Sequence, residues 1–351
     1  MSIGKRAGMG KPGKLFILLA LLLAVFFFLD FITGTVHISL HDLLLSLFPG
    51  SHGINPTLSS IANEFRLPRC LTAVFAGMAL SVSGLQMQTI FRNPLAGPYV
   101  LGISSGASLG VAILVLGMWP MLAGKMNGIP GNWEVLAAAS AGAAIVLLLI
   151  LSVAAKFKDI MTILILGLLF GSAISAVVNI LQYFSDEYSL RTFVLWNMGS
   201  LSGVTRPQLG VLAPAVVAGL IVSLLTGKIL NALLLGESYA MTLGVNIRLA
   251  RFFVFVSTSI LAGSITAFCG PIGFIGIAVP HLARIVFRTS DHHVLIPASM
   301  LLGALVMLIS DLICQLPGHD IVLPVNSITA LLGVPVVVWV IVKNIRISNP
   351  A

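Results

Sequence analysis

The sequence predicts an all-α, polytopic membrane protein. Of its 351 residues, 58% are hydrophobic and only 9% are charged. Soluble domains carry roughly 25% charged residues, so the composition excludes a soluble protein. The apolar residues also gather into stretches of about 20, the length at which an α-helix crosses the hydrocarbon core of a bilayer. Several stretches contain Pro and Gly, which lipid tolerates only where protein or a water-filled cavity satisfies the freed backbone groups.

About ten stretches have the length and apolar character of a membrane span. Their expected limits are 15–33, 68–90, 97–118, 134–155, 160–182, 208–227, 252–270, 273–287, 294–314 and 325–342. The eighth is short and is flanked by glycine and proline. A single transmembrane domain at 15–343 is therefore expected between short tails at 1–14 and 344–351.

The basic residues predict the orientation of the chain. If both termini are cytoplasmic, only five of the 19 Lys and Arg residues fall on the opposite side: Arg66, Arg69, Lys125, Arg191 and Arg206. This distribution follows the positive-inside rule. The basic residues are scattered at the ends of apolar runs rather than clustered, which argues against a nucleic-acid partner.

The first apolar run, with Lys5 to Lys14 before it, resembles a signal peptide. It is too long for one and lacks a clear cleavage site, so an uncleaved first helix is expected. The segment 8–14 also approaches a phosphate-binding loop, but Leu15 stands where Ser or Thr would hold magnesium. The chain therefore has no predicted ATP site of its own.

The residues that usually carry catalysis or metal binding are sparse. Cys70, Cys269 and Cys314 lie far apart in apolar surroundings, which suits packing. His37, His41, His52 and His319 have no ligand spacing. No catalytic residue, cofactor or metal is predicted. The acidic residues Asp30 and Asp311 lie inside the spans but near their outer ends, whereas carriers driven by an ion gradient place such groups near the midplane.

Two segments share a pattern. Residues 77–104 and 257–284 each contain a helix rich in small residues, a Pro/Gly break and a second short helix. Five spans separate the two copies, so they would have opposite orientations, as in transporters built from inverted repeats.

Gly102, Gly106 and Gly110 share one face of the third span and are expected to permit close helix packing.

The fifth span carries a polar stripe formed by Ser172, Ser175, Asn179, Gln182 and Asp186, spaced three and four residues apart. The stripe has two interpretations, a pathway lining or hydrogen bonding between helices within the bundle.

On the cytoplasmic side, 228–251 is too long for a turn and mixes apolar and polar residues. Short surface helices are expected there, either lying on the membrane or docking a separate ATPase.

Several motifs together resemble the FecCD family, the ten-helix permeases of ATP-binding-cassette importers for iron-siderophores, haem and cobalamin. The similarity runs from about Leu15 to Lys343. It is carried by RLPR at 66–69, SGLQMQTIFRNPLAGPYVLGISSGA at 83–107, LGESYAMTLGV at 235–245, CGPIGFIGIAVPHLAR at 269–284 and LPVNSITALLGVPVVVWVI at 323–341.

The resemblance implies a homodimer in the inner membrane, a dimer of cytoplasmic ATPases and a periplasmic or lipid-anchored binding protein that delivers a bulky chelate. It implies ATP-driven alternating access without covalent chemistry in this chain. Iron-siderophore ranks first as cargo, then cobalamin and haem. A secondary carrier independent of ATP is the alternative class, and it would need the midplane charges that this chain lacks.

The resemblance also assigns roles to particular residues. Gln315 departs from relatives that often carry an arginine at this position, which puts one docking contact in doubt and leaves Arg191 or Arg206 as alternatives. The resemblance implies a pathway between the fifth and tenth helices, lined by Ser172, Ser175, Asn179, Asn326 and Ser327. It implies an ATPase-coupling element that contains Gly236, Glu237, Ala240, Leu243 and Gly244. It also implies that the binding protein docks at Arg66 and Arg69.

Overall fold

The computed structural model describes residues 11–34, 36, 38–39, 41, 56–118, 131–157, 159–315 and 322–348. Residues 1–10 of the predicted N-terminal tail and 349–351 at the other end lie outside this part of the chain, as do His37, His52 and His319. In the described residues every regular element is a helix. This confirms the prediction of an all-α fold.

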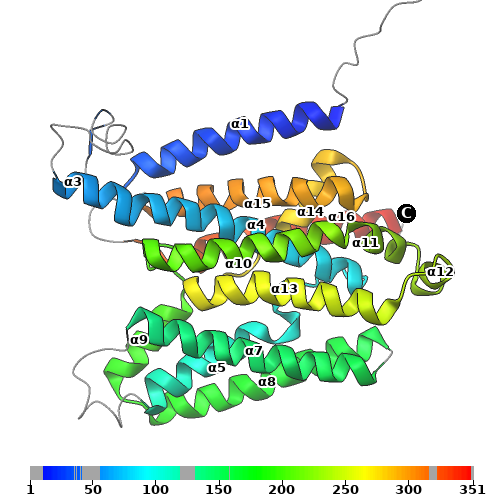
Figure 1. The fold of residues 1–351 in the computed structure, drawn as a ribbon, viewed down its shortest axis with the longest axis horizontal. Coiled ribbons are helices and arrows are strands. Elements are labelled where there is room, and N and C mark those ends of the chain that lie inside the picture. The colour runs from blue at the N-terminus through cyan, green and yellow to red at the C-terminus, as the bar shows by residue number, and fades with distance from the viewer. Residues whose placement is uncertain are drawn as a thin grey trace, which may run out of the picture.

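The long helices lie side by side along the longest axis of the molecule, with α1 at one edge and α8 at the other (Figure 1). The elements are α1 (Lys11–Ile32), α3 (Pro56–Ser60), η1 (Ile61–Arg66), α4 (Leu67–Ile90), η2 (Pro98–Leu101), α5 (Ile103–Ala112), η3 (Ile113–Met118), α7 (Asn132–Lys156), α8 (Ile160–Phe184), α9 (Glu187–Asn197), α10 (Arg206–Leu225), α11 (Gly227–Leu234), α12 (Glu237–Thr242), α13 (Ile247–Cys269), α14 (Ile275–Phe287), α15 (His292–Gln315) and α16 (Val325–Ser348).

Seven helices in the described residues are long and apolar enough to cross a membrane, and three shorter apolar helices lie at 103–118, 275–287 and 325–340. These segments follow the predicted spans in order, which confirms a polytopic membrane protein. That each of them crosses the bilayer stays a prediction. The α12 end of the bundle, meaning the end that carries α11 and α12, is also where α1 begins and α16 ends (Figure 1).

Several predicted boundaries differ from the structure. The second span begins at Pro56 rather than near 68, because α3 and the π-helical η1 run directly into α4. Helix α1 begins at Lys11 and α16 continues to Ser348, so parts of both predicted tails are helical. The helix α9 was not predicted, although Asp186 and Glu187 are the N-cap and first-turn residues typical of a helix start.

The glycines predicted to allow close packing do so in part. A Cβ atom on Gly106 would lie 2.6 Å from the carbonyl oxygen of Gly142, so α5 and α7 approach at backbone distance. Gly110 meets Ala138 in the same way. Gly102 differs: it lies between η2 and α5 with a φ of 73°, where it ends one helix and begins the other.

Both predicted breaks are present, and they lie against each other. The first joins α4 to η2, and the second joins α13 to α14. The Tyr99 hydroxyl donates to the carbonyl oxygen of Ile272 (2.8 Å) and accepts from the Ile272 amide (3.2 Å). His281 on α14 binds the carbonyl oxygen of Pro94 at 2.8 Å. The helix that follows each break therefore supplies a side chain that satisfies backbone groups of the other break.

Candidate functional site: a polar hollow, an exposed apolar helix and two buried arginines

A hollow of about 440 Å³ lies between α8 and the η2–α5 junction. The predicted stripe residues Ser172, Ser175 and Asn179 line it together with Gly102 and Ser105. All three stripe residues are exposed in the single chain. The stripe is shorter than predicted, because α8 ends at Phe184 and Asp186 instead caps α9 by accepting from the Ser189 amide.

The serines of the stripe bond within their own helix. The Ser172 hydroxyl donates to the carbonyl oxygen of Leu168 (3.0 Å), and the Ser175 hydroxyl donates to that of Gly171 (2.9 Å). Among the described residues, neither serine makes a hydrogen bond to another helix. This favours the interpretation as a lining over the interpretation as contacts between helices. The transport role of these residues stays a prediction.

The two tenth-span residues differ in their environment. Ser327 is exposed, whereas Asn326 is half-buried and its Oδ1 accepts from the backbone amide of Gly273 at 2.8 Å. That amide belongs to the break before α14. Asn326 thus holds the break in place and ties α16 to it, in addition to any part in a pathway.

The predicted coupling segment forms two short helices, α11 and α12, as expected for 228–251. Gly236 and Gly244 flank α12 with φ angles of 114° and 82°, values that L side chains rarely adopt. The Glu237 carboxylate accepts from the Arg251 guanidinium at 2.7 Å, which ties α12 to α13. Ala240 is fully buried. The element is therefore anchored at its base and bent sharply at both ends.

The outer surface of α12 is apolar and uncovered. Leu243 is 58% exposed, and Tyr239 and Met241 are exposed beside it. The neighbouring α11 is fixed to the start of α15, because Asn231 donates to the Asp291 carboxylate (2.6 Å) and accepts from the His292 amide (2.8 Å). The hydrogen bond from Asn231 holds the pKa of Asp291 below its ordinary value.

The two arginines predicted to dock a binding protein are buried, with exposures of 3% for Arg66 and 8% for Arg69. Arg66 donates to the carbonyl oxygens of Phe31, Ile32 (2.7 Å) and Val36. Arg69 donates to those of Asp30 (2.9 Å) and Thr33 (3.1 Å). A helix leaves its last carbonyl groups without partners, and these two side chains satisfy them at the end of α1.

Arg69 is also the centre of a buried charged cluster. Its Nε lies 3.0 Å from Asp311 Oδ2, and its Nη2 lies 3.6 Å from Asp30 Oδ1. Gln315 Nε2 donates to the same two carboxylates at 3.2 Å each. Gln315 thus joins the cluster through its side-chain amide. Asp30 and Asp311 both lie near the outer ends of predicted spans. Their similar depth is the sequence feature that could have indicated that they lie close together.

Exposed charges at the end opposite α12 come from other residues. Arg206, at the start of α10, lies 3.4 Å from Glu64 of η1, and both side chains are largely exposed. Arg191 on α9 is also exposed. The alternatives predicted for docking are therefore accessible in this chain, whereas Arg66 and Arg69 are engaged inside it.

Long apolar helices with two broken regions that hydrogen-bond to each other are typical of a multi-pass permease. Irregular backbone is tolerated at membrane depth there because other parts of the protein supply its hydrogen-bond partners. The model of the FecCD transport family matches residues 22–343, and the chain belongs to this family. It is a transmembrane subunit of an ATP-binding-cassette importer in the inner membrane. It is not an enzyme, and it works with ATPase and substrate-binding partners.

Similar proteins agree with this assignment. The chain is 36% identical over 310 residues to the vitamin B12 import system permease protein BtuC of Salmonella typhi, covering 86% of this chain and 92% of the relative. The BtuC protein of Salmonella paratyphi A is 37% identical over the same length. An ABC transporter assigned to the metal-chelate type, solved in an inward-facing conformation, matches with a TM-score of 0.81 and 28% identity, over 94% of this chain and 99% of that one.

Proposed function

We propose that this permease imports a bulky metal chelate and that the chelate is a cobalamin. The observation that carries the proposal is the similarity to vitamin B12 import permeases over nearly their whole length. The ranking of iron-siderophore as first cargo has no support among these relatives, and cobalamin fits better. The match to a transporter assigned to the metal-chelate type supports the broader class.

The proposed assembly is a homodimer with α8 and α16 at its axis. Both helices carry large apolar side chains that no part of the single described chain covers, including Leu169 and Ile180 on α8 and Leu331 on α16. The hollow beside Ser172, Ser175 and Asn179 would then face the second copy. Transport would proceed by alternating access, in which the packed bundle switches between two arrangements.

The two ends of the bundle have different proposed partners. The ATPase would bind at the α12 end, which would be cytoplasmic, and would move the element formed by Gly236, Glu237, Ala240, Leu243 and Gly244. The binding protein would dock at the opposite end. There Arg66 and Arg69 would shape the docking surface by holding α1, and the exposed Arg191 and Arg206 would meet its carboxylates.

The test of this function is uptake by proteoliposomes that contain the permease, its ATPase and its binding protein. Cyanocobalamin should accumulate only with ATP, and a ferric hydroxamate siderophore should not compete for uptake. ATP-dependent uptake of the siderophore without uptake of cyanocobalamin would overturn the cargo but leave the importer class intact.

Docking is measured with the same complex. Charge reversal of both Arg191 and Arg206 to Glu should weaken binding of the substrate-binding protein, more at low salt than at high salt, because rim charges act through long-range attraction. Reversal of Arg66 and Arg69 should also lower the unfolding temperature. Docking that is unchanged in both double variants at low salt would exclude all four arginines.

A further inference from the structure

A second cavity, distinct from the hollow beside α8, lies at the α12 end where α4, α14 and α16 meet. Its volume is about 420 Å³. The polar side chains that line it come from three segments and are those of Gln88, Arg92, His281, Arg284 and Trp339. Ile285 and Val340 add apolar surface to the lining. None of these residues was predicted to belong to the pathway or to the coupling element, although Arg92 Nη2 lies 3.7 Å from the position that a Cβ atom on Gly236 would take.

The cavity contains positive charge that the described part of the chain does not neutralise. Arg284 Nη1 donates to Gln88 Oε1 at 2.6 Å, and Gln88 Nε2 donates in turn to the carbonyl oxygen of Ile277. Among the described residues, neither Arg284 nor Arg92 forms an ion pair with a carboxylate. A partly buried guanidinium held only by a neutral amide still favours an anion beside it.

The backbone at Arg92 adds a second observation. Arg92 follows the last turn of α4 with a φ of 47°, and the next amide, of Asn93, donates to the carbonyl oxygen of Gln88 at 3.2 Å. This bond is that of a Schellman motif, where the left-handed residue is usually glycine. A side chain held in so unfavourable a conformation, at the rim of a cavity, points to a function for that side chain.

We propose that this cavity binds a phosphate group, carried by the headgroup of an anionic phospholipid. Guanidinium groups match phosphate in geometry and charge. The rim suits a lipid, since Trp339 and Ile285 are exposed beside the two arginines and indole rings favour the headgroup region. Basic pockets between helices on the cytoplasmic side are typical sites for anionic headgroups.

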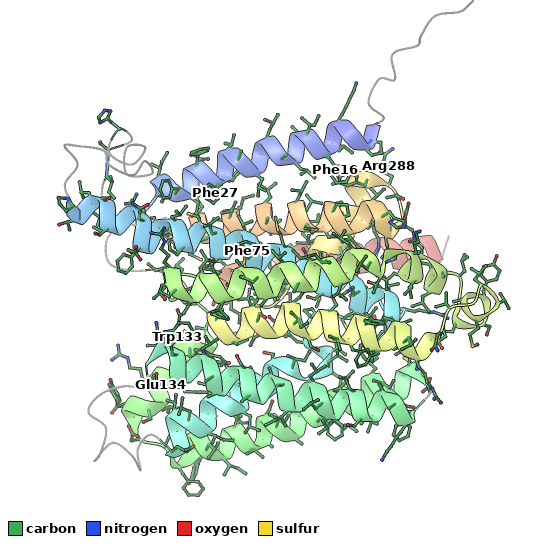
Figure 2. The ribbon with its side chains drawn as sticks, in the orientation of Figure 1. Phe16, Phe27, Phe75, Trp133, Glu134 and Arg288 are labelled. Carbon is green, nitrogen blue, oxygen red and sulfur yellow. The ribbon has the colours of Figure 1, made fainter. Side chains whose placement is uncertain are left out.

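The test compares two matched variants of the complete permease–ATPase complex. Arg92→Gly removes a cavity charge and relieves an unfavourable backbone conformation, so the variant should fold. Arg288→Gly is the control, because Arg288 also has a left-handed φ (51°) just after α14 but does not line the cavity. Arg288 lies at the same end of the bundle (Figure 2).

The measurement is the unfolding temperature of delipidated complex titrated with phosphatidylglycerol, phosphatidylcholine or inorganic phosphate. Phosphatidylglycerol should stabilise the wild type and Arg288→Gly at similar concentrations. Arg92→Gly should need roughly fivefold more lipid, the loss expected for one arginine near an anionic headgroup. Equal stabilisation by inorganic phosphate would identify a soluble anion as the source of the phosphate group.

Two results would overturn the proposal. The first is equal stabilisation by phosphatidylglycerol and phosphatidylcholine, or an equal loss in both glycine variants. The second is an Arg92→Gly permease that binds phosphatidylglycerol normally but no longer retains the ATPase in a pull-down. In that case a carboxylate of the ATPase, rather than a phosphate, would occupy the cavity.

Discussion

At the scale of single residues, the fold depends on polar groups that satisfy irregular backbone. Tyr99 joins the two breaks through one hydroxyl, and Asn326 holds the amide of Gly273. Arg66 and Arg69 do the same for the carbonyl end of α1. In an apolar surrounding such groups cannot turn to water, so each contact contributes to stability through the penalty that its loss would incur.

We predict that Tyr99→Phe destabilises the permease by about 1–3 kcal/mol, because it leaves the amide and carbonyl of Ile272 without their partner. The measurement is the unfolding midpoint in a mild detergent. Tyr183→Phe is the matched control, since Tyr183 is 82% exposed at the end of α8. Equal midpoints for the two variants would contradict the sealing role of Tyr99.

At the scale of elements, α12 is a short helix with fixed ends and an uncovered apolar surface. Gly236 and Gly244 set its direction, and the pair of Glu237 and Arg251 ties it to α13. The bonds from Asn231 fix the adjacent α11 to α15. A force applied to α12 would therefore reach two long helices through polar contacts, as a coupling element requires.

Leu243→Asp should abolish ATP-dependent transport and weaken ATPase association by more than about tenfold, because a charge replaces an apolar contact worth roughly 1.5–3 kcal/mol when buried. Leu243 is exposed in the single chain, so the fold should survive. Pull-down of the ATPase measures association, and Leu243→Met serves as the conservative control. Normal transport by Leu243→Asp would remove Leu243 from the coupling surface.

At the scale of the whole molecule, we propose that a second copy of the chain completes the transport pathway. The hollow beside α8 is open on one side, and the apolar surfaces of α8 and α16 have no cover within the described residues. A second copy placed against these helices would close the hollow and bury both surfaces. In this proposed pair, the conformational change would involve both chains.

We expect single cysteines at Ser172, Ser175 and Asn179 to react with water-soluble thiol reagents in the assembled transporter, and their reactivity should change with nucleotide state. The native cysteines are buried and would be replaced first. A cysteine at Val178, which is 5% exposed because it packs into the buried core, should stay unreactive. Protection of all stripe positions in every nucleotide state would place the pathway elsewhere, near Ser327.

The sequence by itself determined the class of the protein: apolar stretches of membrane length, two Pro/Gly breaks and the FecCD motifs are local patterns. Only the tertiary structure decided that Arg66 and Arg69 lie inside the bundle, because Asp30 and Asp311 reach Arg69 from α1 and α15, which are distant in sequence. The contact between Tyr99 and Ile272 likewise joins distant breaks. Periodicity shows which face of a helix is polar, but the partner of a buried charge depends on which helices become neighbours.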